Sequence, residues 1–248
     1  MFRQEMPRVY ELRDFVVDPS APCAYFQDVD NSIRDEPSKK RAWLAREQEF
    51  QRLDLKSWQF LKCEARPYLA TRDAKRGWEQ LFSILNQARA YNYLLDEGCQ
   101  AVSFISRAKI NGNKTPDLEG VLNGAKVLCE VKTVNISEAE AIRRQIGGVG
   151  STAACLDEGY FNKLRVDVLT AKKQMESYDA SGYVRRIAFI VVNFDDFLAE
   201  YKTDYFGQID QYLAGDCIPG IDIVFYNQRT VFHFQVVMQN AVVINEPG

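Results

Sequence analysis

Hydrophobic residues recur at helical spacing in four stretches of this chain. They predict helices over residues 38–50, 55–65, 76–96 and 162–178, because side chains three or four positions apart share one face of a helix. The helix over 76–96 has the strongest pattern, and Gly98 is expected to end it. Its apolar face contains Leu81, Ile84, Leu85, Ala88, Tyr91 and Leu95. The polar residues before position 38 predict an irregular start.

Shorter apolar runs predict the strands. These runs are bounded by turn-forming residues and are too short for helices. They cover residues 101–108, 116–121, 125–132, 186–193, 222–226 and 231–238. The resulting order is helix, three strands, helix, strand, with further strands towards the end. We therefore expect a main domain at residues 71–248 of mixed helices and strands, preceded by an N-terminal helical extension at residues 1–70.

Composition limits the classes of protein to consider. The chain has 248 residues, of which 46% are hydrophobic, enough for a substantial core. No apolar stretch has the length of a membrane span, and the charged first residues lack the apolar core of a secretory signal. We expect a cytoplasmic protein without a membrane partner. The six cysteines form no C-x-x-C pair, and the single histidine, His233, excludes chemistry that needs two histidines.

One acid and an acid-x-lysine pair stand on two neighbouring predicted strands. Asp117 follows Pro116, and Glu130 and Lys132 lie in the strand after the Asn123-Gly124 turn. Side chains alternate along a strand, so Glu130 and Lys132 should project to the same side. Two carboxylates can bind Mg²⁺, and a lysine ammonium can polarise a phosphate. The alternative is a surface hairpin with ordinary charges.

These residues resemble the motif of the PD-(D/E)xK nuclease superfamily. The resemblance implies an α/β (α+β) domain with a restriction endonuclease-like fold, in which helices flank a mixed sheet. It implies that Asp117 and Glu130 bind Mg²⁺ or Mn²⁺ and that Lys132 is the catalytic lysine. The implied reaction is hydrolysis of phosphodiester bonds by a metal-activated water. DNA is favoured over RNA as the substrate.

Two further features are similar to recombination-type exonucleases of that superfamily. The resemblance implies that Glu79, in the first helix, is an additional metal ligand. It also implies catalytic roles for Gln174 and Tyr178, which match a Q-x-x-x-Y pattern and are spaced to share a helix face. Alternatively, Glu79 is an acid that suits the start of a helix, and Gln174 and Tyr178 belong to an ordinary amphipathic helix. Glu119 is either an extra ligand or a solvent-facing acid.

The substrate-binding candidates are basic pairs. Arg143 and Arg144 follow a capping-box pattern at residues 137–140, which predicts a short helix in a flap beside the site. Lys172 and Lys173 form another pair. The formal charge of −3 means that contact with DNA phosphates must be local. The default interpretation of each pair is a solvated surface.

Two other classes of function stay open. A nuclease-like fold could bind nucleic acid or protein without cutting it. The chain could also hydrolyse RNA or another phosphate substrate. A homodimer would suit cleavage of both DNA strands, but a single sequence does not fix the oligomeric state.

Overall fold

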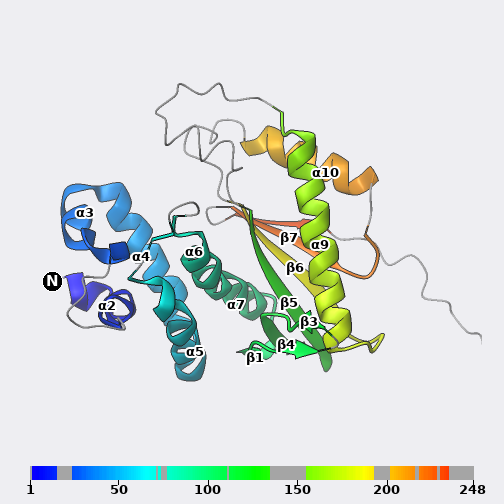
Figure 1. Cartoon of the computed structure of the whole chain (residues 1–248), viewed down its shortest axis with the longest axis horizontal. Helices are drawn as coiled ribbons and strands as arrows, with labels where there is room; N and C mark the ends of the chain where they lie inside the picture. The colour runs from blue at the N-terminus through cyan, green and yellow to red at the C-terminus, as the bar shows by residue number, and fades with distance from the viewer. Residues whose placement is uncertain are drawn as a thin grey trace, which may run out of the picture. The chain divides into compact units, whose positions relative to one another are not determined.

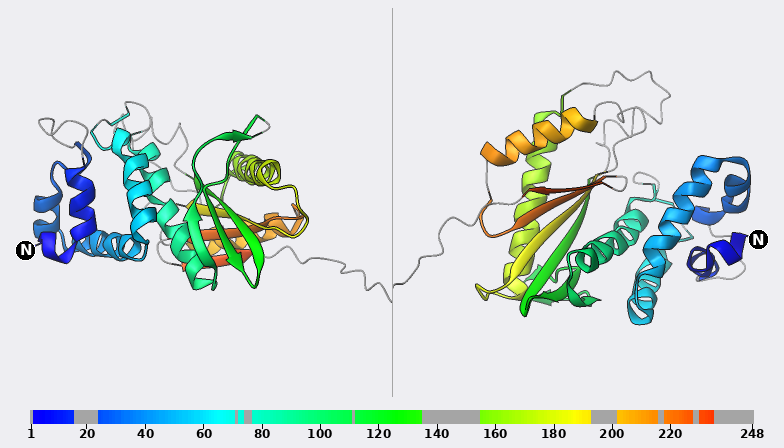
Figure 2. Two further views of the ribbon diagram at one scale, coloured as in Figure 1. Left: turned by 90° about the horizontal axis from the view of Figure 1, so that it is seen from below. Right: turned by 180° about the vertical axis from the view of Figure 1, so that it is seen from behind.

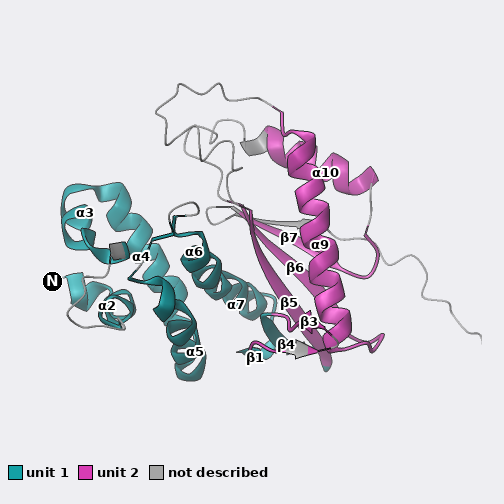
Figure 3. Cartoon of the chain, viewed as in Figure 1, with its two compact units in different colours: residues 1–106, 117–124 teal, residues 107–116, 125–248 magenta. Residues whose placement is uncertain are grey.

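The computed structural model describes nine segments, which fall into two compact units (Figure 3). The described segments are residues 2–15, 24–70, 72–73, 77–110, 112–134, 155–192, 202–215, 218–227 and 230–234. Unit 1 comprises residues 1–106 and 117–124, and unit 2 comprises residues 107–116 and 125–248. The unit boundaries differ from the division at residue 70, which stays a prediction.

Unit 1 is mainly helical (Figure 1). Its α-helices are α1 (Phe2–Glu5), α2 (Pro7–Asp14), α3 (Val29–Asp35), α4 (Pro37–Gln51), α5 (Leu55–Ala65), α6 (Glu79–Leu85) and α7 (Gln87–Asp96). Short 3₁₀ turns lie at Ala24–Phe26 and Arg66–Tyr68. The predicted helices over 38–50 and 55–65 are confirmed as α4 and α5. The expected irregular start is wrong, since α1, α2 and α3 lie there.

A buried carboxylate explains one of these early helices. Glu47 of α4 is buried and accepts the backbone N–H of Arg8 at 3.2 Å and of Val9 at 2.8 Å. Both donors belong to the first turn of α2, whose N–H groups have no partner within the helix. The cap for α2 therefore comes from a residue far along the sequence, which local periodicity does not reveal.

The predicted helix over 76–96 is divided in two. Asn86 separates α6 from α7, and its carbonyl accepts the N–H of Arg89 at 3.0 Å, the tighter spacing of a 3₁₀ turn. Asparagine competes poorly for helix interiors because its side chain favours other local hydrogen bonds. Gly98 follows α7 with φ of 85°, which confirms the expected glycine at the helix end.

Asp54 is the N-cap of α5 and gives a stability prediction. Its Oδ1 accepts the Ser57 N–H at 2.7 Å, and Tyr91 donates its hydroxyl to Oδ2 at 3.2 Å. The Ser57 N–H, as the largest cause, lowers the pKa of Asp54. A lowered pKa means that this stabilisation is present above the unfolded value of about 3.9 and is lost as the pH falls through the folded value.

We expect Asp54→Ala to lower the free energy of unfolding by about 1 kcal/mol at pH 7. Asp54→Asn is the matched variant, because it keeps a cap acceptor but cannot titrate. Urea unfolding at pH 7 and at acid pH would show a gap between wild type and the alanine variant that narrows on acidification. An equal gap at both pH values would contradict the assignment.

Unit 1 also contains an antiparallel pair of strands, β1 (Gln100–Phe104) and β4 (Leu118–Leu122). The strand predicted over 101–108 is shorter and ends at Phe104, although the N–H of Ile105 still bonds to the carbonyl of Asp117 at 2.9 Å. The chain passes from β4 to the next strand through Asn123 and Gly124. Both have positive φ, 52° and 81°, which is the conformation of a type I′ turn.

Unit 2 contains a mixed sheet with helices packed on it (Figures 1 and 2). Its strands lie in the order β5 (Ala125–Val134), β6 (Arg185–Val192), β7 (Asp222–Asn227) and β8 (Thr230–Phe234). β5, β6 and β7 are parallel, and β8 is antiparallel to β7. The long helix α9 (Glu158–Tyr178) connects β5 to β6 and packs on both. The mixed α/β character is therefore as predicted.

Two elements of unit 2 were missed from the sequence. Helix α10 (Lys202–Gly215) lies between β6 and β7, and Phe206 meets Phe225 of β7 with 6.5 Å between ring centroids. A small antiparallel hairpin, β2 (Lys109–Ile110) and β3 (Asn113–Lys114), precedes β4 in the chain. None of the helices in the segments listed above has the length and apolar character needed to cross a membrane.

Candidate functional site

The Glu-x-Lys pair lies on one face of β5, as the alternation predicts. The Glu130 side chain is 6% exposed and that of Lys132 is 20% exposed. The Lys132 Nζ lies 2.7 Å from Glu130 Oε1, a short, charge-assisted hydrogen bond. The intervening Val131 is buried on the other face of the strand. The two residues thus form a partly dehydrated ion pair.

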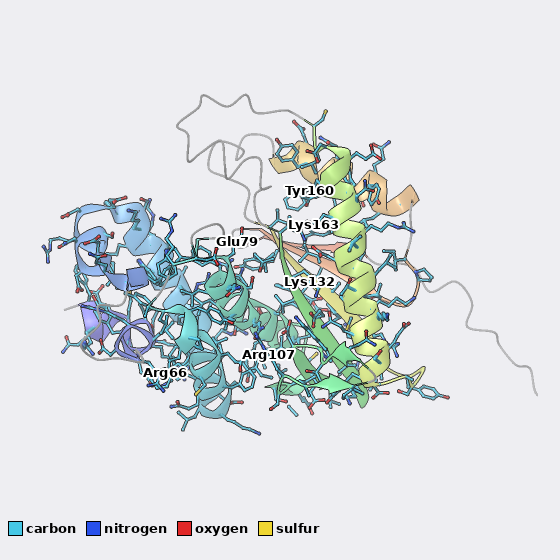
Figure 4. The ribbon with its side chains drawn as sticks, viewed as in Figure 1. Arg66, Glu79, Arg107, Lys132, Tyr160 and Lys163 are labelled. Carbon is cyan, nitrogen blue, oxygen red and sulfur yellow. The ribbon has the colours of Figure 1, made fainter. Side chains whose placement is uncertain are left out.

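Helix α9 completes this cluster with Gln174. The Gln174 side chain is buried, and its Oε1 accepts a second hydrogen bond from Lys132 Nζ at 3.1 Å. Lys132 therefore lies between β5 and α9 (Figure 4). The ammonium has three N–H donors, so these two acceptors fix its position and leave a third donor for another group.

Glu130 carries a buried oxygen without a hydrogen-bond partner. Its Oε1 accepts from Lys132, whereas its Oε2 has no partner in the structure. Buried polar atoms are nearly always hydrogen-bonded, because burial without a partner is costly. A hard cation such as Mg²⁺ or Mn²⁺ takes carboxylate oxygen as a ligand. Glu130 Oε2 is therefore an oxygen ligand of the kind that the expected metal takes.

The described residues supply few protein ligands for a metal at Glu130. Within the described segments, no three His, Cys, Asp or Glu side chains gather at one point. Mg²⁺ commonly keeps several waters and binds through one or two carboxylates. A small carboxylate set is compatible with such a cation.

Asp117 and the predicted accessory acids lie in unit 1. Asp117 is half-buried just before β4, and its Oδ1 accepts the Gln87 amide at 3.0 Å. Glu79 is half-buried at the first residue of α6 (Figure 4), where an acid suits the helix dipole. Glu119 is half-buried in β4, opposite Ser103. Sequence reasoning missed Gln87, because it lies inside the stretch predicted as a single helix and carries no local signal of this contact.

The two residues of the Q-x-x-x-Y pattern contact different lysines. Gln174 binds Lys132, whereas the Tyr178 ring lies 4.9 Å from the ammonium of Lys126. That ammonium is also 3.3 Å from Asp179 Oδ2. Lys126 precedes Lys132 by six residues, about 20 Å along a strand. The structure thus brings Gln174 to the Glu-x-Lys pair and places Tyr178 at the other end of β5.

The predicted substrate-binding residues are placed only in part. Lys172 donates to the carbonyl of Pro219 at 2.7 Å and lies 3.7 Å from Glu176, so its ammonium holds the turn before β7. Lys173 is exposed on α9. Arg143 and Arg144, with the predicted flap, lie outside the described residues.

Comparison of this sequence with models of protein families finds no match. Comparisons with curated proteins and with solved structures likewise find none. The function is therefore inferred from the residues and their geometry.

Proposed function

We propose that this chain is a metal-dependent nuclease that hydrolyses phosphodiester bonds in DNA, on a restriction endonuclease-like fold. The observation that carries the proposal is the cluster of Glu130, Lys132 and Gln174. It combines a buried carboxylate that has one oxygen without a hydrogen-bond partner with an ammonium held by two acceptors. The sequence pattern adds Asp117 as the second carboxylate of a D…ExK motif.

Each residue has a definite role in this proposal. Glu130 and Asp117 are the oxygen ligands for Mg²⁺ or Mn²⁺, which when bound supplies Lewis-acid stabilisation of the phosphate charge. Lys132 directs a fixed positive charge at the phosphate oxygen that becomes more negative in the transition state. Gln174 positions Lys132, because its Oε1 holds one N–H and orients the ammonium.

A substrate panel tests the proposal. Wild-type protein is incubated with supercoiled plasmid, end-labelled linear duplex and labelled RNA, each with Mg²⁺ or Mn²⁺ and each with EDTA. We expect metal-dependent cleavage of DNA. Nicked circular plasmid would indicate an endonuclease, and linear duplex shortened from its ends would indicate an exonuclease. Cleavage of RNA alone would replace the DNA assignment. Cleavage of none of them would favour a binding module or another phosphate substrate.

We expect Gln174→Ala to lower kcat about tenfold, with KM nearly unchanged. A hydrogen bond to a charged group contributes about 1.5–3 kcal/mol, and 1.4 kcal/mol corresponds to a tenfold rate change. A fall in kcat alone indicates loss of an interaction made in the transition state. The matched control is Thr170→Ala, an exposed position one turn earlier on α9. Equal kinetics for both variants would remove Gln174 from the site.

A further inference from the structure

The hairpin of β2 and β3 carries a local concentration of positive charge. Residues 107–116 contain Arg107, Lys109 and Lys114 and no acid, in a chain whose net charge is −3. Arg107 and Lys114 are exposed. The segment belongs to unit 2, as do β5 and α9. A compact basic element in an acidic protein suggests an anionic partner.

Hydrogen bonds anchor the base and one flank of the hairpin, and the space beside Gly112 is unfilled. Thr115 is buried, its Oγ1 accepts the Ala108 N–H at 3.2 Å, and its own N–H donates to the Ala108 carbonyl at 3.1 Å. Asn113 donates to Ser177 Oγ of α9 at 2.9 Å. At the tip, a Cβ on Gly112 would meet no atom within 4 Å. The basic residues thus belong to an arm, the β2–β3 hairpin at residues 107–116, that these hydrogen bonds hold in place.

Helix α9 connects this arm to the Glu130, Lys132 and Gln174 cluster. Gln174 binds Lys132, and Ser177 lies three residues further along the helix, about 4.5 Å of helical rise. Lys173 precedes Ser177 by four residues and is exposed, so it lies on the same side of α9 as the anchor of the arm. Figure 4 labels Arg107 and Lys132 in these two regions.

We propose that the β2–β3 hairpin, together with Lys173, binds the phosphate backbone of duplex DNA beside the Lys132 site. This inference rests on the proposed nuclease function and deepens it by assigning a substrate-binding surface. Lysine and arginine contacts to phosphates position a protein on nucleic acid without reading its sequence. The arm therefore contributes affinity and orientation to cleavage at Lys132.

The test is the salt dependence of binding to a labelled DNA duplex, measured in EDTA so that no cleavage occurs. The variant Lys114→Gln with Lys173→Gln is compared with Lys39→Gln with Lys163→Gln. The control lysines are exposed; Lys39 pairs with Glu36, the residue before α4, and Lys163 pairs with Asp167 of α9. Both double variants lose the same charge. Each phosphate contact contributes about 0.9 to the slope of log K against log salt. We expect the slope to fall by about two in the first variant and to stay at the wild-type value in the control.

The outcomes separate this inference from the proposed function. Equal slopes and equal affinities in both double variants would overturn the inference, while metal-dependent cleavage by the same proteins would still support a nuclease. If the slope of log K against log salt falls as expected but no protein cleaves DNA, the DNA-binding arm is supported and the nuclease proposal is rejected. Wild-type protein that does not bind the duplex would overturn the inference.

Discussion

Replacing Lys132 with alanine is expected to slow DNA cleavage by about 100- to 1000-fold, the usual cost of losing one transition-state stabilising donor. The ammonium is held by Glu130 at 2.7 Å and by Gln174 at 3.1 Å, and the alanine variant lacks this charge. Single-turnover rates on an end-labelled duplex measure the effect on the chemical step.

Lys126→Ala is the matched control for this variant. Lys126 lies on the same face of β5 and is also paired with an acid, Asp179, but it lies away from Gln174. We expect near wild-type cleavage from this control and an unchanged circular dichroism spectrum from both variants. Equal losses in the two variants would show that general destabilisation, and not catalysis, explains the effect of Lys132.

Glu130→Gln is expected to abolish the binding of Mg²⁺ or Mn²⁺. Its buried Oε2 lacks a hydrogen-bond partner, and the substitution replaces the carboxylate by a neutral amide. A ligand that binds only the folded state at 100 times its Kd stabilises that state by about 2.7 kcal/mol. The wild type should therefore melt at a higher temperature when metal is added, and the variant should not. Calorimetric titration gives the same comparison without heating.

Two further variants serve as comparisons for Glu130→Gln in this experiment. Asp117→Ala should weaken metal binding if Asp117 is the second carboxylate. Glu176→Gln removes the same charge from an exposed position on α9 and should leave metal binding unchanged. Metal-induced stabilisation of Glu130→Gln equal to that of wild type would place the cation elsewhere and contradict the role of Glu130.

The sequence predicted those features of the fold and site that depend on local periodicity. Alternation along β5 placed Glu130 and Lys132 on one face, and their contact confirms it. Helical spacing located α9, and the Q-x-x-x-Y pattern singled out Gln174, which the structure brings to Lys132. The alternation and the helical spacing join residues two, three or four apart, whereas the contact of Gln174 with Lys132 joins residues 42 apart.

Features that depend on distant residues were not predictable. The start of α2 is capped by Glu47, nearly 40 residues later. Asp117 accepts a hydrogen bond from Gln87, on a helix that precedes it. The ammonium of Lys172 binds the carbonyl of Pro219, 47 residues later, and its contact with substrate stays a prediction. A residue type and its local pattern do not show which distant backbone group will compete for its side chain.

The proposal that Glu130 and Lys132 belong to a metal-dependent nuclease site is tested by conversion of supercoiled plasmid in the presence of Mn²⁺. Wild type, Lys132→Ala and Lys126→Ala are compared at equal concentration, with parallel reactions in EDTA. We expect cleavage by wild type and Lys126→Ala, cleavage about 100- to 1000-fold slower by Lys132→Ala, and none by any protein in EDTA. Equal metal-dependent cleavage by all three proteins, or none by wild type, would contradict the proposal.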